Sequence, residues 1–334
     1  MTRLKLDGFT GLLLLTVALT SILPCRGSAA SVFAVLTKAA IVLLFFMHGA
    51  KLSRDAVLAG LGAWRLHLLV LAATFGLFPL LGLGIARIPA SVLDPDIAQG
   101  MVFLSILPST VQSSIALTAI AGGNVAAAVC SASLSNILGV FVTPALAAVM
   151  LPHTTGAGQG GFLAAVTDIA TTLLLPFLAG HMSRRWTAHF VHRHKALLMR
   201  LDRGSILLVV YTAFSAAVVE GLWQRITAAD LVAILVLDAL LLAVVLFVTT
   251  RVARLFGFAR ADEIVVVFCG SKKSLASGVP MAAALFPVSL VGTMVLPLMF
   301  FHQLQLLVCA VLARRYAERT AESAAAGAPV PEAA

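Results

Sequence analysis

The chain has 334 residues, of which 60% are hydrophobic and 11% are charged. Soluble domains carry roughly 25% charged residues, so this composition excludes a protein surrounded by water and indicates an integral membrane protein. The net charge of +9 would suit a nucleic-acid-binding protein, but the Lys and Arg residues lie in short connectors between apolar segments. We therefore expect the lipid bilayer, and no nucleic acid, as the partner of this surface.

Apolar segments recur along the chain, each long enough to cross about 30 Å of hydrocarbon as a helix. We predict ten spans, at residues 9–25, 30–50, 66–86, 97–121, 124–150, 161–182, 203–221, 228–250, 261–286 and 289–313. The predicted fold is an all-α polytopic membrane protein with one ten-helix unit over residues 1–315. A disordered cytoplasmic tail rich in Ala, Pro and Glu is expected over residues 316–334.

The first 30 residues permit two interpretations. Arg3 and Lys5 precede an apolar stretch that ends at Pro24, and small residues follow, an order typical of a secretory signal. The same residues suit a first transmembrane span, which is the interpretation we favour. Either one leaves the topology of the later spans unchanged.

Basic residues indicate the orientation of the spans. When both termini are placed in the cytoplasm, seventeen Lys and Arg residues fall on the inner side and only Arg26, Arg87 and Arg225 fall in outside connectors. This bias follows the positive-inside rule. The sequence therefore predicts a multi-pass protein of the inner membrane with both termini cytoplasmic.

A basic connector over residues 181–202, expected as a sizeable loop, divides the chain into two halves of five spans. An odd number of spans in each half means that residues 9–150 and 161–313 insert in opposite directions, as inverted repeats of transporters do. The His residues of the connector suit a solvated basic loop near anionic lipid better than a metal site. The four cysteines, Cys25, Cys130, Cys269 and Cys309, have no metal-ligand spacing, so we expect no metal.

Two spans contain helix breakers beside polar side chains, Pro108 in the fourth span and Gly270 in the ninth. The polar side chains are Ser109, Thr110, Gln112, Ser113 and Ser114 in the fourth span, and Ser271, Lys272, Lys273 and Ser274 in the ninth. Freed backbone cannot face lipid, and two half-helix N-termini that meet there would attract a carboxylate or a sulfonate. We predict a substrate- or ion-binding site at these residues. The alternative is a pair of ordinary Pro and Gly kinks filled by Ser and Thr.

Adjacent lysines near mid-membrane need compensation, because each costs roughly 2.5–3.5 kcal/mol on insertion scales. We expect one of Lys272 and Lys273 to pair with Asp238 in the eighth span, and the other to meet an anionic substrate or exchange a proton. The alternative is that both side chains extend to the cytoplasmic surface.

Several other polar residues lie within predicted spans, among them Asn136, Lys38 and Asp168. Asn136 gives the fifth span a polar face next to the interrupted fourth span, suited either to the site or to contact between helices. Lys38 is, with Asp238, among the deepest charges, whereas Asp168 is expected close to the outer interface.

Five segments carry a resemblance to a known family: residues 45–53, 107–114, 122–128, 268–275 and 278–281. Together they resemble the bile acid:sodium symporter superfamily, most closely its sodium/bile-acid-cotransporter-7-like branch, over residues 9–315. The resemblance implies two inverted five-helix repeats with helices 4 and 9 unwound where they cross. It also implies a panel domain of spans 1, 2, 6 and 7, and a core domain of spans 3–5 and 8–10. A small organic anion would move through the crevice between them by alternating access.

The chain departs from the sodium-coupled members of this family. Those members carry an acidic residue followed by Gln and Asn in helix 9, and a Ser-Asn pair in helix 4. Here Phe268, Lys272 and Lys273 stand at the helix 9 positions, and Ser113 and Ser114 form the pair. Two ammonium groups in place of a carboxylate disfavour a nearby Na⁺. We therefore expect no resident cofactor and a Lys ammonium where Na⁺ would sit, so that H⁺ coupling or uniport replaces Na⁺ coupling.

Two other classes of function compete with a secondary transporter. A regulatory or homeostatic membrane protein with little transport of its own fits the same branch. An intramembrane lipid-modifying enzyme is disfavoured, because the sequence has no HExxH motif and no GxSxG elbow. We therefore do not expect an enzyme, and the sequence leaves the substrate and the oligomeric state open.

Overall fold

The computed structural model describes residues 8–51, 63–151 and 170–325, and these ranges contain helices and short connectors but no strand. The predictions on Arg3, Lys5, Asp168 and the last nine positions of the tail, 326–334, lie outside the described residues.

The helices before residue 151 follow the first five predicted spans, with the third and fourth spans each divided. They are α1 (Gly8–Ile22), α2 (Ser28–Lys51), α4 (Trp64–Ala72), the π-helical turn η2 (Ala73–Leu77), α5 (Phe78–Ile85), α6 (Pro95–Ile106), α7 (Gln112–Ile120) and α8 (Val125–Met150).

The helices after residue 170 follow the later spans, and the ninth span is divided in the same way as the fourth. They are η3 (Ala170–Leu174), α10 (Leu175–Arg193), α11 (Lys195–Val219), α12 (Leu222–Arg225), α13 (Ala228–Leu255), α14 (Arg260–Gly270), α15 (Leu275–Leu285) and α16 (Val288–Ala325).

Six helical stretches of the described chain are long and apolar enough to cross a bilayer. They are Ser28–Lys51, Trp64–Ile85, Val125–Met150, Ala196–Val219, Ala228–Leu255 and Val288–Arg319. Large apolar side chains such as Val35, Leu80 and Leu240 are more than half exposed, as expected for surfaces that face lipid. The chain is therefore a polytopic helical membrane protein. The fourth and ninth predicted spans are not among the six, because each is broken into two short helices.

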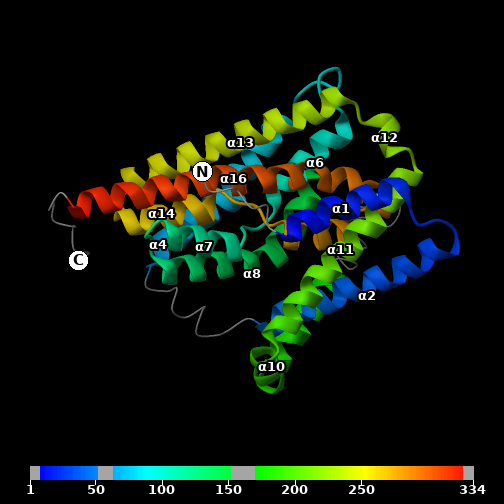
Figure 1. Cartoon of the computed structure of the whole chain (residues 1–334), viewed down its shortest axis with the longest axis horizontal. Helices are drawn as coiled ribbons and strands as arrows, with labels where there is room; N and C mark the ends of the chain where they lie inside the picture. The colour runs from blue at the N-terminus through cyan, green and yellow to red at the C-terminus, as the bar shows by residue number, and fades with distance from the viewer. Residues whose placement is uncertain (1–7, 52–62, 152–169, 326–334) are drawn as a thin grey trace.

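The helices form two groups. In the first helix group (α1, α2, α10 and α11), α2 contacts both α10 and α11, and α1 contacts α11. In the second helix group (α4 to α8 and α13 to α16), α16 contacts α6, α13 and α15. Figure 1 shows α13 and α16 running side by side, with α2 and α10 extending from the other side of the molecule. Contacts of α11 with α15 and α16 join the two groups.

Small residues allow α2 and α10 to cross at backbone distance. A Cβ atom on Gly49 would overlap the carbonyl oxygen of Phe177, and one on Gly180 would overlap the carbonyl oxygen of Phe46. Glycine at both positions removes the side chains that would hold the helices apart, as is common between membrane helices.

Two expectations from the sequence are wrong, one about residues 181–202 and one about the C-terminal tail. Residues 181–202 are not a loop but the end of α10 and the start of α11, interrupted only at His194. The segment is polar, yet it has no Gly or Pro, so nothing in it stops a helix that leaves the membrane. Likewise α16 continues past residue 315 to Ala325, so the part of the expected disordered tail that the structure describes is helical.

Candidate functional site: two helix breaks beside a cavity

The first break separates α6 from α7. Leu107 is extended (φ −75°, ψ 154°), and the ring of the following Pro108 disfavours helical backbone at this residue. Helical structure resumes only at Gln112. Four residues of backbone between these points therefore have no helical hydrogen-bonding pattern of their own.

The second break separates α14 from α15. Helix α14 ends at Gly270, and Ser274 is the extended N-cap of α15 (φ −85°, ψ 109°). The Ser274 hydroxyl accepts a hydrogen bond from the backbone N–H of Ser277 (3.1 Å), which satisfies one free donor of the new helix.

The two breaks contact each other directly. The backbone N–H of Ser274 donates to the carbonyl of Pro108 (2.9 Å). From the α6–α7 side, the Ser109 hydroxyl donates to the carbonyl of Cys269 (2.5 Å), and the Ser114 hydroxyl donates to the carbonyl of Phe268 (3.0 Å). Protein groups thus form hydrogen bonds with the backbone N–H and C=O groups that the breaks leave unpaired. Such bonds are required inside a membrane, because lipid tails offer no hydrogen-bond donors or acceptors. Two ordinary kinked helices would not need these bonds.

Lys273 lies in a cage of backbone carbonyls. Its ammonium donates to the carbonyl oxygens of Thr74 (2.8 Å), Ser105 (2.7 Å) and Leu107 (2.7 Å), and the side chain is fully buried. The ammonium also lies 4.1 Å from the ring centroid of Phe78, at a distance that allows a cation–π contact.

The carbonyls of this cage come from places where helical bonding fails. Ser105 and Leu107 lie at the C-terminal end of α6, where carbonyls lack helical partners and a positive charge is favoured. Thr74 belongs to the π-helical turn η2, a local widening that often occurs at functional sites. Lys273 therefore compensates the broken α6 in the way that a bound cation would.

Gln305 of α16 holds the backbone of the second break in place. Its side-chain carbonyl accepts from the N–H of Lys273 (2.8 Å), and its amide donates to the carbonyl of Lys273 (2.9 Å). Both polar groups of this one unwound residue are therefore satisfied by a single amide side chain.

Lys272 has a different environment. Its side chain is fully buried, and its ammonium has no hydrogen-bond partner among the residues that the structure describes. The ammonium lies 5.6 Å from the ring centroid of Phe268, with the Cys269 and Cys309 thiols as neighbours. Neither lysine extends to the cytoplasmic surface. The expected ion pair with Asp238 is not formed either, because neither carboxyl oxygen of this buried residue has a hydrogen-bond partner in the described part of the chain.

A cavity of about 390 Å³ lies where both interrupted helices restart, and we call it the break cavity. The start of α7 contributes Gln112 and Ser113, and the start of α15 contributes Leu275 and Ala276. Helices α1, α2 and α11 of the first group and α8 and α16 of the second complete its walls. Two helix N-termini, each with free N–H groups and a partial positive charge, thus border one space.

The predicted site residues divide into two sets. Those that line the break cavity are Thr110, Gln112, Ser113, Asn136 and Ser274. Those behind its wall are Ser109, Ser114, Ser271, Lys272 and Lys273, all essentially without exposed surface. Of the second set, Ser109, Ser114 and Lys273 form bonds across the breaks, whereas the Ser271 hydroxyl donates to the carbonyl of Val267 within α14 (2.6 Å).

Asn136 connects α8 to both breaks. Its amide donates to the carbonyl of Ser109 (2.7 Å), and its carbonyl oxygen accepts from the Ser277 hydroxyl (2.9 Å). The polar face of the fifth span therefore serves the site as well as contact between helices.

Five polar residues that line the break cavity were not among the predicted site residues: His48, Asp202, Arg203, Ser277 and His302. Asp202 also forms an ion pair with Lys51 that joins α11 to α2. The sequence carried no signal for Asp202 and Arg203, because they fall at the boundary of a segment that was expected to be a loop. Ser277 lies three residues after the N-cap, a spacing that could have placed it in the first turn of α15.

No cluster of three His, Cys, Asp or Glu side chains that could hold a metal ion occurs within residues 8–51, 63–151 and 170–325. The polar groups of the break cavity are hydroxyls, amides, two imidazoles, the Asp202 carboxylate and the Arg203 guanidinium, beside two helix N-termini. These are groups that bind organic ligands by hydrogen bonds.

Broken helices that meet inside a bundle of apolar helices, beside a cavity, define a membrane transporter. The chain belongs to the SBF-like CPA transporter family, which it matches over residues 7–318. It is 55% identical to the putative symporter YfeH of Escherichia coli over 94% of each chain, and 54% identical to the uncharacterized protein PA2026 of Pseudomonas aeruginosa over 97% of each. It is also 26% identical to sodium/bile acid cotransporter 7 of Danio rerio, over 83% of this chain and 82% of the relative.

Proposed function

We propose that this protein is a secondary active transporter that moves a small organic anion across the inner membrane by alternating access. The observation that carries the proposal is the break cavity, which the N-termini of α7 and α15 both border. The first N–H groups of a helix have no acceptor within that helix, and its N-terminus carries about half a positive charge. This is the pattern that recognises a carboxylate or a sulfonate in discontinuous membrane helices.

The architecture that we propose has ten membrane helices in two inverted repeats, residues 9–150 and 161–313. The first helix group would be the panel domain, and the second helix group the core domain that carries both breaks. The break cavity supports this division, because its walls come from both groups. Movement of one group against the other would then change the side from which the cavity is reached.

We propose that Thr110, Gln112, Ser113, Asn136 and Ser274 bind the anion, and that Ser109, Ser114, Ser271 and Lys273 keep the two breaks in register. Lys272, buried without a hydrogen-bond partner, is the candidate for a proton-carrying group. Asp238 on α13 is a second candidate, because it is also buried and its carboxyl oxygens have no hydrogen-bond partner among the described residues. A transporter with such groups needs no metal and no enzymatic step.

Sodium coupling is not part of the proposal, although the printed names of several relatives include sodium. The Lys273 ammonium already fills a carbonyl cage at the crossing of the breaks with a positive charge. A second cation in the same cage would be repelled.

The test has two stages. A thermal-shift screen of short-chain carboxylates and sulfonates on the purified protein identifies a ligand, since a ligand that binds only the folded state raises the melting temperature. Uptake of that ligand is then measured in proteoliposomes, with an inward Na⁺ gradient replaced by an equal choline gradient.

We expect concentrative or exchange uptake that is unchanged by the replacement of Na⁺. A steep dependence on Na⁺ would overturn the coupling proposal. Stabilisation by the ligand without any flux would overturn transport and favour a regulatory membrane protein. Gln112→Ala should weaken uptake, whereas Gln303→Ala, on α16 outside the walls of the break cavity, serves as the control.

A further inference from the structure

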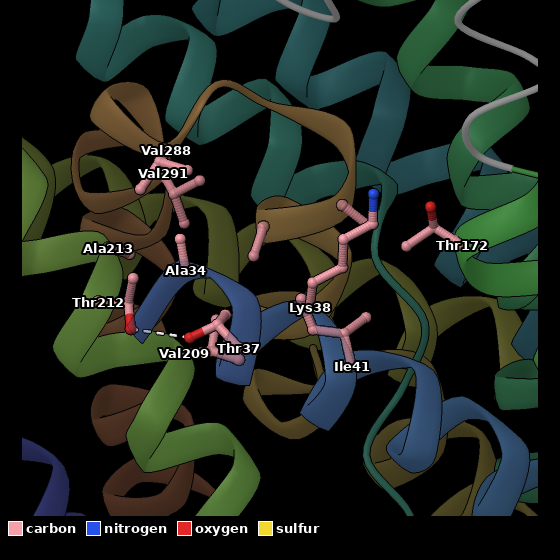
Figure 2. Close-up of a pocket in the computed structure, with 12 residues that line it drawn as sticks. Ala34, Thr37, Lys38, Ile41, Thr172, Val209, Thr212, Ala213, Val288 and Val291 are labelled. Atoms are coloured by element: carbon pink, nitrogen blue, oxygen red, sulfur yellow. Dashed lines mark hydrogen bonds between the residues drawn. The ribbon is translucent and has the colours of Figure 1, made fainter. Parts of the chain in front are cut away.

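A second cavity, of about 300 Å³, lies along the same interface between the two helix groups. We call it the Lys38 cavity, after the charged residue that lines it, and Figure 2 shows its walls. Alanine, valine and isoleucine side chains from α2, α11, α15 and α16 form most of the lining. The polar lining residues are Thr37, Lys38, Thr172 and Thr212.

Lys38 lies in the middle of a membrane span. Helix α2 extends ten residues before it and thirteen after it, from Ser28 to Lys51, and is apolar enough to cross the bilayer. Within the described residues, the Lys38 ammonium has no hydrogen-bond or ion-pair partner. A charge at this depth is costly, so in most membrane proteins it faces the bundle interior or a water-filled cavity, pairs with another polar group, or marks the pathway of a substrate or an ion.

The polar and apolar groups of the Lys38 cavity are separated. In Figure 2 the Lys38 ammonium and the Thr172 hydroxyl lie toward one end, whereas Val288 and Val291 lie toward the other. The hydroxyls of Thr37 and Thr212 bond to each other (2.8 Å) and are thus already engaged. The remaining groups suit a ligand with an anionic head near Lys38 and Thr172 and a short apolar body against the valines.

The Lys38 cavity and the break cavity lie one helical turn apart. On α2, Ile41 lines the Lys38 cavity and Leu44 lines the break cavity. On α11, Val209 lines the Lys38 cavity and Ile206 lines the break cavity. Three residues of a helix span about 4.5 Å, so a thin aliphatic layer of these four side chains, none more than 3% exposed, separates the two spaces.

We propose that the Lys38 cavity is a second anion-binding site, on the other side of this aliphatic layer from the break cavity. Its ligand class is a small amphipathic carboxylate or sulfonate, recognised by the Lys38 ammonium. In the orientation that the basic connectors predict, this site is on the outer side of the layer. The ligand class rests on the proposed function, whereas the existence of the site rests on the cavity and on the Lys38 ammonium that lines it.

The test measures the charge preference of the cavity by thiol modification. Ala283→Cys places a thiol in the wall of the Lys38 cavity, in protein that also carries Cys25→Ser, because the other three native cysteines are buried. The thiol is treated with two methanethiosulfonate reagents of similar size, one with a sulfonate and one with a quaternary ammonium group. Reaction rates are compared with and without Lys38→Gln.

We expect the ratio of the anionic to the cationic rate to fall about tenfold when Lys38→Gln is added, and to be retained with Lys38→Arg. Hexanesulfonate should slow the modification in protein that has Lys38, and this protection should be lost with Lys38→Gln. Val92→Cys, in a connector far along the chain from α2, is the control position, and its rate ratio should not respond to Lys38→Gln.

An unchanged rate ratio at position 283 would overturn the proposal, because it would mean that the ammonium does not act on the cavity. An anionic lipid headgroup has the same chemistry as the proposed ligand, so the measurement is made in nanodiscs of phosphatidylcholine and again in phosphatidylglycerol. Loss of hexanesulfonate protection only in phosphatidylglycerol would assign the site to lipid and overturn the assignment to a soluble anion.

The labelling experiment does not require transport. Protection at position 283 without uptake in proteoliposomes would count against the proposed function and leave the second site standing. Uptake in proteoliposomes with no charge preference at position 283 would overturn the second site and leave the proposed function standing.

Discussion

Lys272 and Lys273 are neighbours in the sequence and are equally buried. They differ in the number of hydrogen bonds that their ammonium groups make. The Lys273 ammonium satisfies three carbonyl oxygens at the crossing of two broken helices, whereas the Lys272 ammonium has no hydrogen-bond partner. Composition and spacing treat the two residues alike. Only their partners distinguish a lysine that stabilises the structure from one whose burial opposes it.

The same substitution at each position should therefore have opposite effects. Lys273→Met removes three charge-assisted hydrogen bonds and leaves their acceptors buried, which should cost about 3–5 kcal/mol of stability. Lys272→Met replaces an unpaired buried charge by an apolar side chain of similar length and should leave stability unchanged or raise it. Thermal unfolding of the two purified variants in one detergent measures the difference. Equal melting temperatures would contradict the assignment of the cage.

The sequence located the breaks, because proline and glycine beside several polar residues are costly in an apolar span unless the helix is interrupted there. It could not identify which polar residues line the break cavity. Ser113 and Ser114 both bond the Thr110 hydroxyl, yet only Ser114 also donates to the carbonyl of Phe268, and no pattern in the sequence distinguishes the two. The partners of Lys273 are backbone carbonyls. Every residue has a backbone carbonyl, so the identity of the side chains does not show which residues accept these bonds.

At the scale of helices, hydropathy predicted where helices lie better than where they end. Helices α10, α11 and α16 all continue beyond the apolar residues that define their spans. An apolar window detects the boundary of the hydrocarbon, whereas a helix ends where a breaker or a cap ends it. The pairing of α2 with α10 was not predicted, because small residues promote close approach without indicating the partner helix.

The close crossing of α2 and α10 predicts that a larger side chain at the crossing point destabilises the protein. Gly180→Val would push its side chain into the backbone of α2 at Phe46 and should cost about 1–3 kcal/mol through overpacking. Gly204→Val is the matched control on α11, where an added Cβ has no neighbouring atom within 4 Å. Yield of folded protein and melting temperature of both variants are the measurements. A control variant that is as unstable as Gly180→Val would show that helix propensity, not the crossing, is responsible.

At the scale of the whole molecule, the proposed mechanism requires the first helix group to move against the second. Ala217 of α11 and Gly292 of α16 contact each other across that boundary, and an added Cβ on Gly292 would lie 2.8 Å from the Cβ of Ala217. Disulfides need a Cβ to Cβ distance of about 3.5–4.5 Å, so a small shift allows one to form between cysteines at these two positions.

A disulfide across this boundary should stop transport, and reduction should restore it. The variant pair is Ala217→Cys with Gly292→Cys, and uptake is measured in proteoliposomes after oxidation and after reduction. The control pair is Asn124→Cys with Asp262→Cys, which joins α8 and α14 within the second helix group, where the native side chains lie 3.0 Å apart. Full transport by the oxidised Ala217→Cys, Gly292→Cys protein would rule out relative movement at this boundary.

The carbonyl cage has a consequence for assembly of the protein. A metal ion that held the broken helices together would arrive after synthesis and could leave again by dilution or chelation. The positive charge on Lys273 is attached covalently to the chain, so forming the crossing and loading its cation are a single event. The mature protein should therefore melt at the same temperature in sodium, potassium and choline buffers of equal ionic strength.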